Sequence, residues 1–113
     1  MFEDGETDRI SLVAEEGGVL LGFLVARKIG DECELQSIVV AEAGRHRGVG
    51  SKLIGALIGS GRDRKINRIF LEVRESNGIA RSFYEACGFS MAGRRNSYYN
   101  DPPEDAVLYT LTV

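Results

Sequence analysis

The chain has 113 residues, a net charge of −3, and 43% hydrophobic and 27% charged residues, a balance typical of one folded, water-soluble domain. The negative charge argues against a protein that coats nucleic acid, and no apolar run approaches the roughly 20 residues of a membrane-spanning helix. Cys33, Cys87 and His46 are the only cysteines and histidine, so a zinc site or a serine-histidine triad would be hard to build on this chain alone. We therefore expect no metal, no nucleic acid and no membrane partner.

The first residues are acidic and polar and lack the basic start and apolar stretch of a secretory signal. We therefore predict a cytoplasmic location. Residues 1–9 are expected to be flexible, and residues 1–113 to form a single domain without a linker. The two cysteines lie far apart in sequence and form no CxxC pattern, so we interpret both as packing residues.

The first half of the chain predicts a three-stranded antiparallel meander. Residues 10–15 and 19–27 are apolar runs separated by a Glu-Gly-Gly break, which is typical of two strands joined by a tight hairpin. Residues 32–40 first alternate and then become continuously apolar, as expected of a strand that enters a buried position in the sheet.

The middle of the chain predicts two helices with a strand between them. Residues 48–62 show helical spacing of apolar residues despite the four glycines that follow Gly48, each of which weakens the helix by about 1 kcal/mol where it falls in the interior. Residues 68–73 are expected to form a strand. Ser76 or Asn77 is a plausible N-cap for a second helix, whose apolar stripe is Ile79, Phe83 and Cys87 and which Gly88 ends.

Two closing strands are expected near residues 90–94 and 107–113, separated by the loop-forming sequence at residues 100–104. The predicted order is therefore strand-strand-strand-helix-strand-helix-strand-strand. This order gives an α+β fold with a mixed, mainly antiparallel sheet and helices packed on it.

The strongest local signal is Arg45-His46-Arg47-Gly48-Val49-Gly50-Ser51, which links a buried strand to a helix. A helix N-terminus offers unpaired amides and partial positive charge, and glycines let the backbone approach a bulky anion. The spacing fits neither the dinucleotide-binding fingerprint nor a P-loop. The alternative is that the two glycines merely shape the turn.

Three ordered motifs resemble the GCN5-related N-acetyltransferase (GNAT) family. They are Arg45-x-x-Gly48-x-Gly50 after an apolar strand, Leu71-Glu72-Val73-Arg74 with Ser76-Asn77, and Phe83-Tyr84-Glu85-x-x-Gly88-Phe89. Within the family the chain is most similar to the RimI type, which acetylates the N-terminal amine of a ribosomal protein. The motifs that carry this similarity are Leu71-Glu72-Val73-Arg74, Arg94-Arg95-x-x-Tyr98-Tyr99 and Glu104-Asp105-Ala106. The resemblance spans about residues 10–113.

The resemblance implies that acetyl-CoA is the co-substrate and that its parts lie along these motifs. Backbone amides near Ile38, Val39 and Val40 would hold the acetyl-pantetheine arm and polarise the thioester, and Asn77 would contact the arm. The pyrophosphate would be bound by the backbone amides of His46, Arg47, Gly48, Val49, Gly50 and Ser51.

Glu72 and Tyr84 are the candidate catalytic pair. Glu72 would act as the general base, directly or through a water, because acyl transfer needs a neutral amine; a free glutamate has a pKa of about 4.3. Tyr84, as a phenol, would donate a proton to the departing thiolate. The alternatives are a glutamate on a half-exposed strand face and a tyrosine that fills the core.

Several basic and aromatic residues have two possible roles. Arg45, Arg47 and Lys52 would meet the phosphates of the coenzyme or simply lie on the surface at a helix start. A second group would form the acceptor wall or the surface of an amphipathic hairpin, and it comprises Arg94, Arg95, Tyr98 and Tyr99.

Family members usually begin with a strand and two helices, which line the acceptor groove, before the hairpin placed here at residues 10–27. Residues 1–9 are too few to form them, so we expect an N-terminally truncated fold with a sheet edge at residues 10–15. An exposed edge invites pairing, and we expect a homodimer. The leading function is acetylation of a protein N-terminus; the alternatives are a small-amine acetyltransferase and a CoA-binding module without useful catalysis.

Overall fold

The computed structural model describes residues 8–113. Six strands and two α-helices follow the predicted order, with a short 3-10 helix, η2, before the first α-helix. Their bounds are β1 Arg9–Glu16, β2 Val19–Ile29, β3 Glu32–Val40, η2 Glu42–Gly44, α1 Val49–Asp63, β4 Arg68–Arg74, α2 Gly78–Ala86, β5 Ser90–Asn100 and β6 Pro103–Thr112. Of the segment predicted to be flexible, residues 1–7 lie outside the described part, and Arg9 begins β1.

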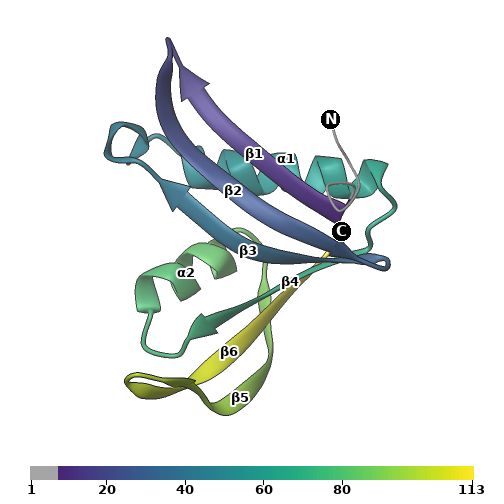
Figure 1. Cartoon of the computed structure of the whole chain (residues 1–113), viewed down its shortest axis with the longest axis vertical. Coiled ribbons are helices and arrows are strands. Elements are labelled where there is room, and N and C mark those ends of the chain that lie inside the picture. Colours follow the sequence, from purple (N-terminus) through teal and green to yellow (C-terminus); the bar gives the residue numbers. More distant parts are fainter. Residues whose placement is uncertain (1–7) are drawn as a thin grey trace.

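The six strands form one twisted sheet in the order β1-β2-β3-β4-β6-β5 (Figure 1). β3 and β4 are parallel, and the other neighbours are antiparallel. The predicted α+β class with a mixed, mainly antiparallel sheet is confirmed. β1 and β5 are the two edges, as predicted for β1. The turn between β1 and β2 falls at Gly17 and Gly18, both with positive φ, as a tight hairpin requires.

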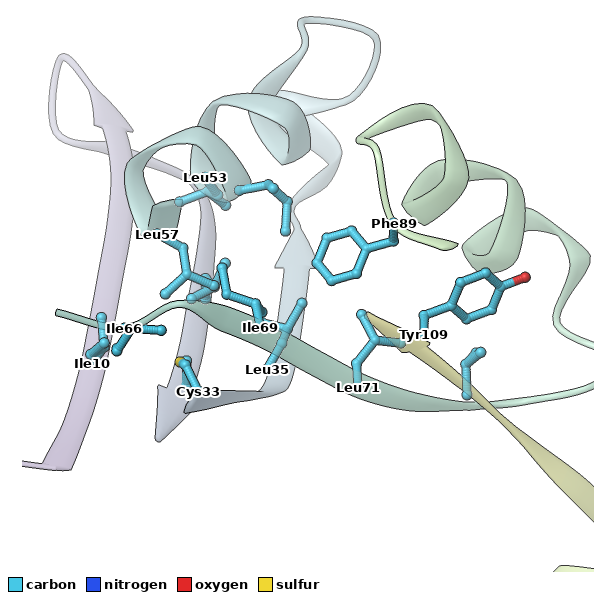
Figure 2. Close-up of a cluster of buried hydrophobic side chains, with 14 of the residues drawn as sticks. Ile10, Cys33, Leu35, Leu53, Leu57, Ile66, Ile69, Leu71, Phe89 and Tyr109 are labelled. Atoms are coloured by element: carbon cyan, nitrogen blue, oxygen red, sulfur yellow. The ribbon is translucent and has the colours of Figure 1, made fainter. Parts of the chain in front are cut away.

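Both helices cover the same face of the sheet. The chain passes from β3 through α1 to β4, and from β4 through α2 to β5, so both crossovers move across the sheet in the same direction. Because such crossovers are right-handed, their helices lie on one side. Figure 2 shows this side filled by Leu53 and Leu57 from α1 and by Phe89, together with the inward-facing Ile69 and Leu71 of β4.

The opposite face of the sheet, called here the open face, carries no helix within the described residues. Strand alternation and register place a row of apolar side chains there, and two of them, Val13 and Val39, are 65% and 44% exposed. The row consists of Val13, Phe23, Val25, Val39, Phe70 and Leu108. Glu72 pairs with Leu108 across β4 and β6, so Glu72 shares this face.

β3 and β4 pair at one end and then separate. Their parallel pairing covers Glu32–Glu34 with Arg68–Phe70, although both strands continue beyond these residues. The register between β2 and β3 skips Gln36, since Val25 faces Ser37 and Ala26 faces Leu35. An extra residue of this kind bends the strand that carries it. The bulge therefore turns the end of β3 away from β4.

The predicted boundaries of the closing strands were wrong. β5 continues to Asn100 and β6 begins at Pro103, so the predicted loop at residues 100–104 shrinks to a turn at Asp101 and Pro102. Proline can occupy the first position of a strand, and Asp105 Oδ1 accepts a hydrogen bond from the Ser97 backbone N–H at 2.8 Å across the hairpin. Loop-forming composition alone does not show this cross-strand contact.

Candidate active site

A cavity of about 660 Å³ opens beside the separated end of β3. Its volume falls within the range of small-molecule sites, about 300–1,000 Å³. The end of β3, the turn that follows, the first turn of α1 and one side of α2 form its wall. Ten of the predicted site residues line it: Ile38, Val40, Arg45, His46, Gly48, Val49, Gly50, Ser51, Asn77 and Tyr84.

Three predicted residues, Val39, Arg47 and Glu72, are not among the lining residues. The Val39 side chain points to the open face, so this residue can serve the cavity through its backbone alone. Arg47 forms an ion pair with Glu16 at the end of the β1–β2 hairpin, a contact between segments too far apart in sequence to be anticipated. Glu72 lies on the open face, two residues beyond the last β3–β4 pair.

The separation of β3 from β4 leaves one edge of β3 unpaired at the cavity. Ile38, Val39 and Val40 pair with β2 on one side, whereas β4 accompanies β3 only as far as Glu34. An unpaired strand edge presents a row of N–H and C=O groups to an extended partner. The prediction that this segment can act as a hydrogen-bonding strand for a ligand is consistent with this geometry.

The two glycines of the turn serve different structural purposes. Gly48 is the N-cap residue of α1 with φ +72°, and a Cβ added there would meet nothing within 4 Å, so Gly48 supplies left-handed backbone. At Gly50 a Cβ would lie 3.0 Å from the Phe83 ring of α2. Gly50 therefore lets the two helices approach each other, and the turn is partly structural, as the alternative interpretation held.

The start of α1 has free donors. α1 has no side-chain N-cap hydrogen bond and no acidic residue in its first turn. The Lys52 N–H donates to Gly48 O at 3.1 Å, so the N–H groups of Val49, Gly50 and Ser51 precede the first helical hydrogen bond. Unpaired amides at the positive end of a helix dipole attract an anion, and all three residues line the cavity.

The start of α2 is fixed by Asn77. Its Oδ1 accepts a hydrogen bond from the Ala80 N–H at 3.1 Å, which confirms it as the N-cap; the amide nitrogen is not used in this cap. Gly88, with φ +100°, follows the C-cap residue Cys87, as predicted. The prediction of Ile79 in the buried stripe was wrong, because Ile79 is 89% exposed and lies at the cavity wall.

Sequence reasoning missed four residues of the wall: Gly44, Ile79, Ala80 and Phe83. Phe83, predicted in the apolar stripe of its helix, both packs against the core cluster and faces the cavity. At Gly44 an added Cβ would lie 2.4 Å from the Leu21 carbonyl oxygen. The helical spacing of Ala80 and Phe83 with Tyr84 was the available signal, since these neighbours share one side of α2.

Tyr84 is anchored by aromatic contacts on three sides. Its ring centroid lies 5.4 Å from that of Phe83, 5.7 Å from Phe89 and 6.4 Å from Tyr109. Burial raises the pKa of the Tyr84 hydroxyl, and the neighbouring Cys87 adds to the effect. The phenol therefore keeps its proton at neutral pH and is available as a hydrogen-bond donor in the cavity wall.

The Glu72 side chain is 17% exposed and lies beside a cation. Arg95 Nε of β5 is 2.5 Å from Glu72 Oε2. The pair nevertheless lacks hydrogen-bond geometry, and within residues 8–113 this buried oxygen receives no hydrogen bond. We regard the contact as a close charge pair without an aligned N–H. Glu72 also contributes to the raised pKa of Tyr99, whose main cause is burial.

The two cysteines are free thiols, with Cys33 buried and Cys87 half-buried. Burial raises both pKa values, and at Cys87 a hydrogen bond with Ser51 opposes this effect. A protonated thiol is a poor nucleophile, which supports their interpretation as packing residues. Among residues 8–113 no three potential metal ligands gather into a site, and neither helix is both long and apolar enough to span a membrane.

Comparisons with known proteins agree with this architecture. The model of the acetyltransferase (GNAT) family matches residues 2–89. The chain is 33% identical over 105 residues to the [ribosomal protein bS18]-alanine N-acetyltransferase of Haemophilus ducreyi, which covers 90% of this chain and 72% of that protein.

Two solved structures are also similar. The crystal structure of the ribosomal-protein-S18-alanine N-acetyltransferase from Escherichia coli matches with a TM-score of 0.83 and 30% identity, over 94% of this chain and 70% of that one. A Bacillus anthracis protein assigned as a streptothricin acetyltransferase, solved in complex with acetyl coenzyme A, matches with a TM-score of 0.87 and 27% identity, over 94% and 64%.

The cleft beside a separated β3, the free helix N-terminus and these matches together define the class: the chain belongs to the GNAT acetyltransferase family. It is an acetyl-CoA-dependent N-acetyltransferase of the RimI-like type. The resemblance stated from the three sequence motifs is thereby confirmed.

Proposed function

We propose that this enzyme acetylates the α-amine of a protein N-terminus that begins with alanine. The relatives that support this substrate are named for alanine of ribosomal protein bS18. The observation that carries the proposal is the position of Glu72 and Tyr84 on opposite sides of the place where β3 and β4 separate. Tyr84 lines the donor cavity and Glu72 lies on the open face.

In this proposal the donor lies with its pyrophosphate against the first turn of α1. The N–H groups of Val49, Gly50 and Ser51 supply hydrogen bonds, and Arg45 and His46 line the same part of the cavity. Arg47 contributes through its ion pair with Glu16, which ties the turn to the β1–β2 hairpin.

The pantetheine arm of the donor would then follow the unpaired edge of β3 at Ile38, Val39 and Val40, with the Asn77 amide nitrogen beside it. This arrangement brings the thioester to the point where the two strands part. There a backbone N–H of β3 can polarise the carbonyl oxygen as charge develops on it.

The acceptor approaches from the open face. Glu72 accepts a proton from the ammonium, directly or through a water, and the neutral amine attacks the thioester carbon. A C–N bond forms and the C–S bond breaks, with the electron pair leaving on sulfur. The attacking nitrogen releases its surplus proton as the amide forms, and this proton replaces the one that Tyr84 gives to sulfur. Tyr84 donates a hydrogen bond to this sulfur and passes its proton on as the thiolate departs. Because its pKa is raised, the hydrogen bond to the developing charge is its larger contribution.

A small amine is the second candidate acceptor. The observation that favours it is the likeness to the streptothricin acetyltransferase structure, whose TM-score exceeds that of the S18-alanine enzyme. In both cases residues 1–113 act as a single domain, and the cytoplasmic location stays a prediction.

We also propose that two copies associate through β1. Within the described residues β1 pairs with β2 on one side and with no strand on the other. An antiparallel β1–β1 pairing centred on Leu12 would set Arg9 against the partner's Glu15 and keep both on the same face of the sheet. Opposite charges directly across such a pair stabilise it. Light scattering after size exclusion should give a dimer mass, and a monomer at high concentration would contradict the proposal.

The substrate is tested with purified enzyme, acetyl-CoA and a hexapeptide that begins with alanine. We expect thiol release and the gain of one acetyl group on that peptide. No transfer is expected to a matched peptide whose N-terminus is already acetylated and which contains a lysine. Acetylation of streptothricin alone would favour the second candidate. Acetyl-CoA binding without turnover on either substrate would mean that the chain is a CoA-binding module.

A further inference from the structure

Arg95 reaches Glu72 across the whole width of β6. In the sheet register Arg95 of β5 pairs with Ala106 of β6, and Ala106 in turn pairs with Arg74 of β4. Ala106 is fully buried although it lies on the open face, which is consistent with the long arginine side chains covering it. A small residue at this position leaves a path along which the guanidinium of Arg95 meets the carboxylate of Glu72.

Three arginines of this region, Arg74, Arg94 and Arg95, differ in the number of partners that hold their side chains. The guanidinium of Arg74 contacts Glu104 Oε1 at 3.2 Å and the Pro102 carbonyl oxygen at 3.3 Å, and it covers the Tyr99 ring at 4.2 Å. Arg94 bridges two carboxylates, those of Glu75 and Asp105. Both arginines have several partners that fix their position.

Arg95 differs because its partners are few and its side chain is 62% exposed. Within residues 8–113 its charged partner is Glu72, and the Tyr98 ring lies 5.3 Å from its guanidinium carbon. The pair lacks hydrogen-bond geometry at the buried Oε2. An exposed arginine in such a pair gains little stability and exchanges readily.

We propose that Arg95 is an exchangeable counter-ion that occupies the place of the acceptor's ammonium group on Glu72. The inference rests on the proposed role of Glu72 as the acceptor-side base. An incoming ammonium needs the same carboxylate, and two cations at one carboxylate repel each other. Arg95 therefore leaves Glu72 when the acceptor binds and keeps its contact with the Tyr98 ring, where cation–π attraction holds it. Arg95 thus sets the affinity for cationic acceptors by competing with them.

The kinetic test replaces Arg95 by glutamine. If Arg95 competes with the acceptor, Arg95→Gln lowers the KM for the alanine hexapeptide about three- to fivefold, the factor expected of a surface ion pair, and kcat does not fall. Arg95→Lys restores the wild-type KM. Arg68→Gln serves as the matched control, because Arg68 also forms a surface ion pair, with Glu32 at 3.6 Å, but lies away from the cavity; it leaves KM unchanged.

An unchanged or higher KM in Arg95→Gln would overturn the inference. A lower kcat that Arg95→Lys restores would also overturn it, since Arg95 would then orient Glu72 instead of competing for it.

A binding readout separates this inference from the proposed function. Alaninamide, a minimal α-ammonium probe, should shift the Arg95 Nε–H resonance in an NMR titration. Neutral N-acetylalaninamide should not, and the shift should vanish in Glu72→Gln. If the wild type acetylates the hexapeptide but the resonance stays fixed, the counter-ion inference fails alone. If the resonance moves but no peptide is acetylated, the proposed substrate fails alone.

Discussion

The proposed donor side and the proposed acceptor side of this enzyme consist of different kinds of groups. The donor cavity is walled by backbone at the start of α1 and at the edge of β3, and by α2 side chains that pack against the core. The proposed acceptor side consists of charged and aromatic side chains on β4 and the β5–β6 hairpin, such as Glu72, Arg95 and Tyr98. Packing against the core fixes the residues of the donor side, whereas pairwise contacts at the surface hold those of the acceptor side.

The difference shows how one fold can keep its donor while its acceptor varies. A backbone edge and a helix N-terminus recognise the parts of a coenzyme without depending on particular side chains. Exposed ion pairs can be exchanged at small cost in stability. The similarity of the chain to both a ribosomal-protein acetyltransferase and a Bacillus anthracis protein assigned as a streptothricin acetyltransferase fits this division.

The largest expected effect is a loss of kcat on replacing Tyr84 or Glu72, and the acceptor KM distinguishes the donor side from the acceptor side. Tyr84→Phe and Glu72→Gln should each lower kcat about 10²-fold or more, the usual contribution of a positioned acid or base. Tyr84→Phe should leave the acceptor KM unchanged, because its hydroxyl serves the departing sulfur. Glu72→Gln should also raise the acceptor KM, because it removes the charge that attracts the ammonium. Steady-state kinetics with both substrates varied provides the measurement.

Glu34→Gln is the matched control for Glu72→Gln, since Glu34 is also a half-buried strand carboxylate. It should retain wild-type kinetics. A loss of acetyl-CoA binding in Glu72→Gln, measured by calorimetry, would contradict the assignment of Glu72 to the acceptor side.

A smaller effect tests how firmly the donor wall is packed. Gly50→Ala places a methyl group 3.0 Å from the Phe83 ring and should lower the free energy of unfolding by about 1–3 kcal/mol through overpacking. Gly55→Ala lies on the same helix, where an added Cβ meets nothing within 4 Å, and should stabilise by up to about 1 kcal/mol. Chemical denaturation measures both. Equal effects of the two substitutions would mean that Gly50 is not a packing position.

The smallest expected effect is a loss of stability at low pH in the β5–β6 hairpin, which carries Glu104 and Asp105. Hydrogen bonds from Ser76 lower the pKa of Glu104 below its usual 4.5, and Arg74 adds to this. The Ser97 backbone N–H lowers the pKa of Asp105 below its usual 3.8. A carboxyl whose folded pKa is lowered stabilises the fold above its unfolded pKa, and this stability is lost as the pH falls through the folded value.

Stability should therefore decline below about pH 4.5. The decline between neutral pH and pH 3 should be shallower in a Glu104→Gln/Asp105→Asn double variant, because that variant lacks both titrations. Thermal unfolding across this pH range measures it. An equally steep decline in the variant would show that other carboxyls govern acid stability.

The same division explains what the sequence could predict. The order of the elements, the Asn77 cap and the glycine turn follow from local patterns of apolar spacing and turn chemistry. The predicted length of the β5–β6 hairpin was wrong because cross-strand contacts, such as that of Ser97 with Asp105, determine where the two strands end and begin. The Arg47–Glu16 and Arg95–Glu72 pairs join residues distant in the chain, so no local pattern announces them.

The most direct test of the account is calorimetric titration of acetyl-CoA against Ser51→Glu. Ser51 is exposed in the first turn of α1 and lines the cavity. A carboxylate there interacts favourably with the helix dipole but repels a pyrophosphate. We predict at least a tenfold loss of affinity, roughly 1.4 kcal/mol, with the thermal midpoint unchanged or raised. Ala56→Glu, exposed on the same helix but away from the cavity, should bind as the wild type does. Wild-type affinity in Ser51→Glu would contradict the claim that this helix start holds the coenzyme.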